Sequence, residues 1–122
     1  PEPKILEDID LPLEKLSTKK GTSAVYQLRF PKIGRYELVF RMSSTLGELA
    51  QLPISVFLNN TLQQTVTLNG TEGQTMERVV TLPIRQDGEK YMKLYFGESG
   101  IDMHRMFLRY AGQNDIESFR NE

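Results

Sequence analysis

Hydrophobic and polar residues alternate along most of the chain in short segments that are separated by turn residues. Alternation with a period of two is typical of β-strands, because successive side chains of a strand point to opposite faces of the sheet. The pattern predicts a less regular first strand over 4–9, and further strands over 24–30, 35–42, 53–58, 62–68, 76–84 and 90–96. One face of the strand over 35–42 is apolar, and we expect it to be buried: Tyr36, Leu38, Phe40 and Met42.

Three segments depart from this pattern. Arg78 interrupts the apolar stripe of the strand over 76–84 and leaves the register of that strand open. The segment 43–52 lacks alternation and contains a glycine, which predicts a loop with one helical turn. The segment 101–110 fits a strand and a helix equally well, because its apolar residues also have helical spacing, with Asp102 in the position of an N-cap.

About eight short strands with turn residues between nearly all of them predict an all-β fold, an antiparallel β-sandwich or jelly roll. Asn69-Gly70 is the strongest of the turn signals, since both residues tolerate a positive φ angle. We expect a single β-sandwich domain over 1–112, followed by a polar C-terminal tail over 113–122. Such folds host many unrelated functions, so the function has to be argued from other features.

The composition narrows the function classes. The chain has 122 residues, enough for one domain, and it contains no Cys, no Trp and a single His. These counts exclude disulfides and thiolate metal sites and leave few groups for acid–base or nucleophilic catalysis, so we expect a protein that is not an enzyme. The net charge of −1 argues against nucleic acid as a partner. No apolar run approaches the roughly 18 residues that a membrane span needs.

Three stretches, taken in order, resemble a known family. The first, 26–41, is a strand, a Pro-Lys-Ile-Gly turn and a second strand that ends in a run containing Arg. The second, 52–60, is a strand that leads into an Asn-Asn turn. The third is 91–96, followed by Gly-Ile-Asp at 100–102. Their order and spacing are similar to those of family 6 and family 35 carbohydrate-binding modules, and the resemblance covers 23–110.

This resemblance implies a β-jelly-roll in which 101–110 is a strand. It implies a non-catalytic module of a secreted carbohydrate-active enzyme, covalently linked to a catalytic domain such as a glycoside hydrolase, in an extracellular or periplasmic location. The module would bind a polysaccharide or oligosaccharide on a preformed surface and so raise the local concentration of the attached enzyme. The alternative is a structural β-sandwich that packs on a catalytic or partner domain and binds no sugar. Because the sequence starts with Pro1 and lacks a signal-peptide core, we interpret it as an excised piece or as a mature chain without its leader.

Four residues are candidates for ligand binding. Family 6 members usually place a sugar-stacking Trp after a Gly near the sixth strand, and the matching position here is Met76. They often carry an Asn two residues before the Asp of the last strand, where this sequence has Gly100. Tyr91 and Tyr95 share the face opposite the apolar residues of their strand, and two phenol rings there would stack on a glycan or pack on a neighbouring domain.

Calcium is the one cofactor that the resemblance implies. Asp102 matches the carboxylate of the family's last strand, and Glu7 and Asp8 are nearest to the acidic pair of its first strand. Three carboxylates that converged at an edge of the sandwich would hold this hard cation, whereas separated carboxylates would be a cap or solvated turn residues. His104 has no metal-ligand spacing or nucleophile motif around it, so we assign it a structural place in its strand.

Overall fold

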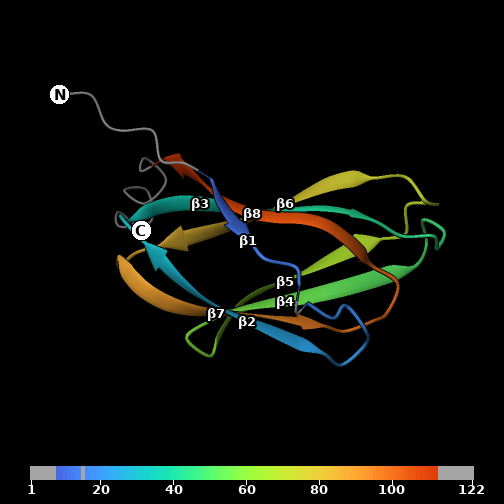
Figure 1. Cartoon of the computed structure of the whole chain (residues 1–122), viewed down its shortest axis with the longest axis horizontal. Coiled ribbons are helices and arrows are strands. Elements are labelled where there is room, and N and C mark those ends of the chain that lie inside the picture. The colour runs from blue at the N-terminus through green and yellow to red at the C-terminus, as the bar shows by residue number, and fades with distance from the viewer. Residues whose placement is uncertain (1–7, 15, 113–122) are drawn as a thin grey trace.

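The computed structural model describes residues 8–14 and 16–112, which form two antiparallel four-stranded sheets that face each other (Figure 1). The strands are β1 (Ile9–Leu11), β2 (Ser23–Phe30), β3 (Gly34–Ser43), β4 (Gln51–Leu58), β5 (Thr61–Asn69), β6 (Met76–Ile84), β7 (Gly88–Phe96) and β8 (Asp102–Gly112). One sheet has the order β1-β8-β3-β6 and the other has the order β2-β7-β4-β5. The antiparallel β-sandwich expected from the alternation is confirmed.

The described residues form strands and turns and contain no helix. The segment 101–110 lies almost wholly in β8, as the resemblance implied. The helical turn expected within 43–52 is wrong. The backbone N–H of Ala50 donates to the carbonyl oxygen of Gly47 at 3.0 Å and closes a turn that is not continued as a helix, and other carbonyl groups of the loop accept hydrogen bonds from a distant loop. The carbonyl oxygen of Ser44 accepts from the backbone N–H groups of Thr71 at 3.3 Å and of Gly73 at 2.7 Å. Over the described ranges, no helix is long and apolar enough to cross a membrane.

The first strand within the described residues begins at Ile9, whereas the alternation predicted a strand over 4–9. Residues 4–7 of the expected strand, like the predicted tail over 113–122, lie outside the described residues. Strand β1 pairs with β8 in a register that places Ile9 opposite Leu108 and Leu11 opposite Met106. This register turns the two apolar residues of β1 toward the core, where Leu11 is buried.

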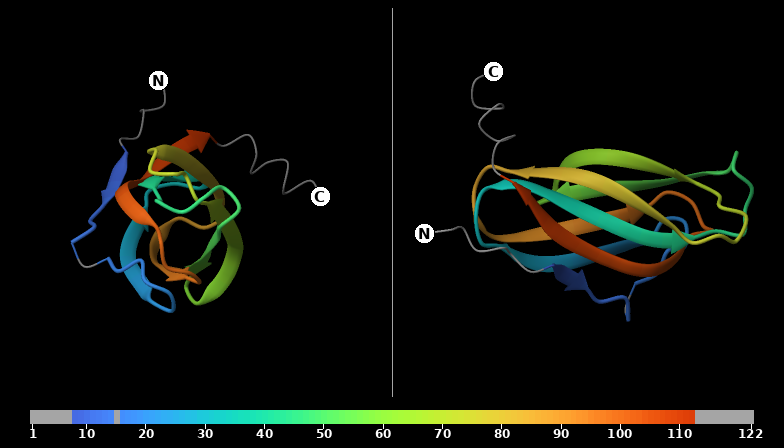
Figure 2. Two further views of the ribbon diagram at one scale, coloured as in Figure 1. Left: turned by 90° about the vertical axis from the view of Figure 1, so that its right-hand side faces the viewer. Right: turned by 90° about the horizontal axis from the view of Figure 1, so that it is seen from above.

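The inner faces of the two sheets enclose one hydrophobic core. The end-on view in Figure 2 shows the two layers of strands around the centre of the domain. The predicted inner face of β3 is buried, with at most 1% of each side chain exposed: Tyr36, Leu38, Phe40 and Met42. The ring of Tyr36 packs edge-on against Phe30 and Tyr110, with centroid distances of 5.0 and 5.1 Å. The Tyr36 hydroxyl donates to the carbonyl oxygen of Lys32 at 2.7 Å, which ties the turn between β2 and β3 to the core.

Strand β6 contains the irregularity that the sequence pattern left open. Arg78 pairs with Phe40 and Met76 pairs with Met42, so both residues lie on the core-facing side of β6. Because β6 ends one sheet and β5 ends the other, these two strands flank an open edge of the sandwich. The side chain of Arg78 is therefore exposed although its backbone position faces inward. The core-facing residues further along β6 are buried: Val80, Leu82 and Ile84.

Several connections meet at one end of the sandwich, on the right-hand side of Figure 1. We call this the loop end and define it by the segments 16–22, 44–50, 70–75 and 97–101. Side chains connect these segments to one another. The Thr18 hydroxyl donates to the carbonyl oxygen of Ile101 at 2.6 Å, and the backbone N–H of Lys20 donates to Ser99 Oγ at 2.8 Å.

We predict that Gly34→Ala lowers the free energy of unfolding by about 1–3 kcal/mol. Gly34 has a φ of 147°, and a Cβ atom there would lie 2.5 Å from the ring of Tyr110. Urea unfolding followed by circular dichroism measures the change. Gly47→Ala is the matched control, because no atom lies within 4 Å of its Cβ position, and we expect it to change stability by less than about 0.5 kcal/mol. Equal midpoints for the two variants would contradict this account of Gly34.

Candidate functional site

The outer face of the β2-β7-β4-β5 sheet carries both predicted tyrosines. The side chain of Tyr91 is 56% exposed and that of Tyr95 is 40% exposed. They are four residues apart in β7, or about 13 Å along the strand. Between them, Lys93 pairs with Val25 of β2 on one side and with Phe57 of β4 on the other. We call this surface the tyrosine face and define it as Val25, Phe57, Leu62, Tyr91, Lys93 and Tyr95.

Contacts within the sheet hold the tyrosine face in place. Lys93 Nζ lies 4.4 Å from the ring centroid of Phe57, a cation–π contact. The backbone N–H of Asn59 donates to the carbonyl oxygen of Tyr91 at 2.8 Å, and the backbone N–H of Tyr91 donates to Asn59 Oδ1 at 3.0 Å. Beside Tyr95, the hydroxyl groups of Ser55 and Thr65 lie 2.9 Å apart. The face is therefore a preformed platform of two flat rings with ammonium and hydroxyl groups next to them.

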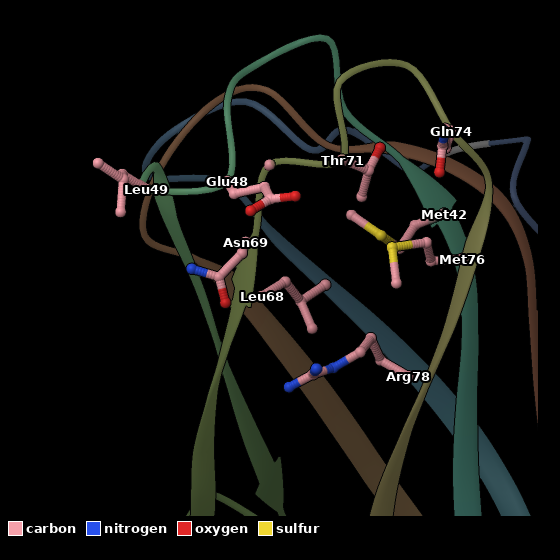
Figure 3. A pocket seen from close by; sticks show the side chains of 10 residues that line it. Met42, Glu48, Leu49, Leu68, Asn69, Thr71, Gln74, Met76 and Arg78 are labelled. Carbon is pink, nitrogen blue, oxygen red and sulfur yellow. The ribbon is translucent and has the colours of Figure 1, made fainter.

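A groove of about 490 Å³ opens at the loop end, on the open edge between β5 and β6 (Figure 3). Its floor contains the buried side chains of Met42 and Leu68 and the half-exposed side chain of Met76. Polar side chains surround this floor: Glu48, Asn69, Gln74 and Arg78. We call it the β5–β6 groove, and its lining is completed by Leu49, Gly70 and Thr71.

The structure does not bring the predicted residues Met76 and Gly100 into one site. Met76 lines the β5–β6 groove, whereas Gly100 is not part of its lining. A Cβ atom at Gly100 would lie 2.7 Å from Cδ1 of Leu46, so Leu46 fills the space that an Asn side chain would need. Leu46 belongs to the loop 44–50, and other residues of this loop line the groove. The loop therefore lies between the two positions.

The carboxylates predicted to bind calcium do not converge within the described residues. Asp102 begins β8, whereas Asp8 precedes β1, in which Ile9 pairs with Leu108. Six residues of extended strand, or about 20 Å, separate the two ends of this stretch of β8. Glu7 lies outside the described residues, and within them no three His, Cys, Asp or Glu side chains are grouped so that they could hold a metal ion. In the described residues Asp8 and Asp102 do not come together, and the calcium site, which also includes Glu7, stays a prediction.

His104 joins two strands of the same sheet. Its Nε2 atom lies 2.8 Å from Ser43 Oγ, at the irregularity in the pairing of β3 with β8. A hydrolytic triad would also need a carboxylate hydrogen-bonded to the other ring nitrogen. None of the described carboxylates makes such a bond with His104. This geometry supports the structural place that we assigned to His104.

The outer face of the β1-β8-β3-β6 sheet differs, because two of its arginines, Arg105 and Arg109, are engaged with neighbouring carboxylates. Arg105 Nε donates to Asp10 Oδ1 at 2.8 Å, and this hydrogen bond holds the pKa of Asp10 below its usual value. Arg109 Nε donates to Glu37 Oε1 at 2.8 Å. The tyrosine face and the β5–β6 groove are therefore the candidate ligand-binding surfaces.

Sequence reasoning found one of these surfaces and missed most of the other. Alternation alone places Tyr91 and Tyr95 on one outward face, as the structure has them. The polar residues of the β5–β6 groove come from the loop 44–50, the end of β5 and the start of β6, and no local pattern connects them. Two sequence signals fall at the groove: the interruption of an apolar stripe by Arg78, and Met76, which the resemblance matches to a sugar-stacking Trp.

Comparisons with known proteins identify the fold. No protein-family model matches the sequence. A β-glucosidase from Ruminococcus albus is 28% identical over 102 residues, so the chain spans only 11% of that protein while 84% of the chain is matched. A family 35 carbohydrate-binding module from Clostridium thermocellum has a TM-score of 0.65 at 14% identity, over 88% of this chain and 92% of that module. The second carbohydrate-binding module of family 6 from Cellvibrio mixtus lichenase 5A, in complex with cellotriose, has a TM-score of 0.60 at 16% identity, over 77% and 74%. The chain has the fold of these modules, as the resemblance implied.

We predict that Gly100→Asn destabilises the protein by about 1–3 kcal/mol. Gly100 has a φ of 124°, and Leu46 occupies the space beside it. Leu46→Ala in the same chain should recover the steric part of this loss, because it removes the atom that the new side chain would meet. A double-mutant cycle by urea unfolding measures the coupling between positions 46 and 100. Additive effects of the two substitutions would show that Leu46 does not block the position.

Proposed function

We propose that this chain is a non-catalytic carbohydrate-binding module that binds a polysaccharide or oligosaccharide on the tyrosine face. The observation that carries the proposal is the exposure of Tyr91 and Tyr95 on one rigid, outward sheet face. A flat ring covers the C–H face of a pyranose, and the phenol hydroxyl remains free to bond with sugar hydroxyls. Two such rings, about 13 Å apart, offer contacts to successive parts of one glycan chain.

Polar groups between and beside the rings suit the same ligand. Lys93 has its ammonium group held over Phe57, midway between the two tyrosines, where it can donate to sugar hydroxyls. The hydroxyls of Ser55 and Thr65 lie beside Tyr95 and can both donate and accept. A sugar requires this combination, because its ring is apolar on the faces and polar at the edge.

The fold supports the proposal, and the residues at the loop end favour the sheet face over a loop site. The family 6 module with this fold was solved with cellotriose. The two positions at which family 6 members carry a sugar-stacking Trp and an Asn hold Met76 and Gly100 here, and Leu46 fills the space at Gly100. With no aromatic ring among the residues of the β5–β6 groove, the exposed rings of the tyrosine face are the better stacking surface.

The proposed mechanism is passive. The module would belong to a secreted carbohydrate-active enzyme, in an extracellular or periplasmic location, and a covalently linked catalytic domain would carry out the chemistry. Binding of the module to an insoluble or polymeric substrate would raise the local concentration of that domain at the glycan. The match to a small part of a β-glucosidase is consistent with such an attachment.

A second candidate function is packing against a linked or partner domain without sugar binding. Val25 is 61% exposed and Leu62 is 53% exposed, and both lie on the tyrosine face. Exposed apolar side chains that adjoin aromatic rings also suit a domain interface. The two functions make opposite predictions for the isolated module, because only the first predicts affinity for a soluble glycan.

We predict that the paired substitution Tyr91→Ala with Tyr95→Ala weakens polysaccharide binding roughly 5- to 150-fold. This range corresponds to about 1–3 kcal/mol for the loss of two aromatic contacts. Affinity electrophoresis in gels with mixed-linkage β-glucan, laminarin, xylan or pectin measures retardation of the wild type and the variant. Circular dichroism of the variant confirms that the sandwich is retained.

The control for this experiment is Val79→Ala, which removes an exposed side chain on the outer face of the other sheet. We expect its retardation to equal that of the wild type. Equal retardation of the tyrosine variant and the wild type would place the binding site elsewhere. No retardation of the wild type on any of the four polysaccharides would favour packing as the function.

A further inference from the structure

Strand β2 lies at the edge of its sheet and pairs with β7 alone. In β7, the backbone N–H and carbonyl groups of Tyr91 both bond with Asn59 on the β4 side, so Tyr91 exchanges no hydrogen bonds with its partner Gln27 in β2. Such pairs alternate with hydrogen-bonded pairs along an antiparallel ladder. Every second residue of β2 therefore directs its backbone N–H and carbonyl groups away from β7, to the free edge: Ser23, Val25, Gln27 and Arg29.

The backbone groups at this free edge are available to a ligand. Among the described residues, none donates to or accepts from the backbone of the four edge residues. The side chain of Val25, in the middle of the strand, is 61% exposed. Extended peptides and other strands add to such an edge, because each unpaired N–H or carbonyl group offers a hydrogen bond.

The other three edge strands have features that hinder strand addition. Strand β1 has three residues, and the ladder of β5 with β4 contains a register shift. In β6, Arg78 faces inward, Pro83 lacks an N–H, and the carbonyl oxygen of Thr81 already accepts from Gln64. Strand β2 pairs with β7 over eight residues without a shift, contains no Pro and carries one charged residue, Arg29, next to its end. Among the edges of the described domain, β2 is thus the long, regular and unprotected one.

A groove of about 430 Å³ runs along the free edge of β2, and we call it the β2 groove. One wall is 23–26, and the other is Pro12 and Glu14 of the connection from β1, which the end-on view of Figure 2 shows beside β2. The Tyr26 hydroxyl donates to the carbonyl oxygen of Pro12 at 2.8 Å, and Leu13 packs against the core, so both walls are held. The exposed side chain of Glu14 makes no hydrogen bond or ion pair with any other described residue.

This groove selects an extended polypeptide as its ligand. Unpaired backbone groups along one wall require partner groups that repeat at the rise of a strand, about 3.3 Å per residue. A second copy of this chain suits the groove less well, because its own β2 lies beside the same wall of Pro12 and Glu14. Side chains of an added strand that oppose Ala24 and Tyr26 would point to the inner side, toward this wall. The carboxylate of Glu14 there is complementary to a basic side chain.

We propose that the β2 groove binds an extended segment of a partner protein as an additional antiparallel strand of the β2-β7-β4-β5 sheet. The backbone of this segment pairs with Ser23, Val25 and Gln27. Its outward side chains are β-branched and contact Val25, and an inward basic side chain pairs with Glu14. Because β2 separates the added strand from β7, both tyrosines of β7 stay uncovered. The site therefore does not depend on the proposed function.

The test uses a heptapeptide probe with blocked ends, Ser-Thr-Lys-Val-Val-Thr-Ser, whose central valine is placed opposite Val25. We expect the probe, added up to about 10 mM to the isotope-labelled full chain, to shift the amide resonances of Ser23, Val25 and Gln27 saturably with a millimolar Kd. A probe that is N-methylated at its central valine lacks a backbone donor and should not bind. A probe with Glu in place of Lys should bind about threefold more weakly, because it faces Glu14.

Val25→Pro should weaken binding of the Lys probe by about fivefold or more, because proline removes the backbone N–H at the centre of the edge. Val25→Thr is the matched control, since it keeps that N–H and a β-branched side chain, and its Kd should stay within about twofold of the wild type. Glu14→Lys should weaken binding of the Lys probe about threefold and strengthen that of the Glu probe. Glu14 lies on an exposed segment, so its variant provides the test if Val25→Pro does not fold.

Three results would overturn the proposal: no saturable shift of the edge amides, equal binding of the N-methylated probe, or undiminished affinity in both Val25→Pro and Glu14→Lys. Shifts of the same amides when the protein alone is concentrated would assign the edge to a second copy of this chain and overturn the peptide as its occupant. Affinity for the Lys probe should be unchanged when Tyr91 and Tyr95 are both replaced by Ala, whether or not any polysaccharide retards the protein. Loss of affinity in that variant would overturn a site separate from the tyrosine face.

Discussion

The burial of β3 between β6 and β8 is the constraint on which the rest of the structure depends. Its inner side chains are inaccessible to solvent, and burial of a large apolar side chain contributes about 1.5–3 kcal/mol. A slip of one residue in the pairing with β6 would turn the whole apolar stripe outward, so the register is strongly specified. Once Phe40 is buried, its partner Arg78 must face the same side and emerge at the open edge. The groove at that edge is thus a consequence of core packing.

Most strands were predictable because apolar and polar residues alternate in them with a period of two. The segment 101–110 is the exception. The segment 101–110 fitted two patterns, since Phe107 interrupts its alternation. In the structure Phe107 faces outward yet is 5% exposed, and the guanidinium of Arg105 lies 4.0 Å from its ring centroid. A strand with apolar residues on both faces no longer has the alternation that distinguishes it from a helix. Only its pairing with β3 and β1 decides the outcome.

The sites were less predictable because they depend on residues that are distant in the sequence. The loop 44–50 bonds to the loop 70–75, and the chain separating these loops contains no signal of that contact. The sequence supplied two candidate carboxylates, Asp8 and Asp102, but only the pairing of β1 with β8 shows that they lie far apart. The tyrosines of β7 were predictable because both lie on one strand, where every second side chain points to the same face.

The side-chain amide of Gln64 connects the two sheets at their open edge, and this has a consequence for how such a domain can evolve. Gln64 Nε2 of β5 donates to the carbonyl oxygen of Thr81 in β6 at 2.6 Å. Because β5 and β6 belong to different sheets, this contact is made by a side chain and not by a ladder of backbone hydrogen bonds. A single substitution at that position would remove this contact between the sheets without changing loop length or a core residue. Point mutation alone can therefore alter how the two sheets are connected at this edge while the strands around the core stay the same.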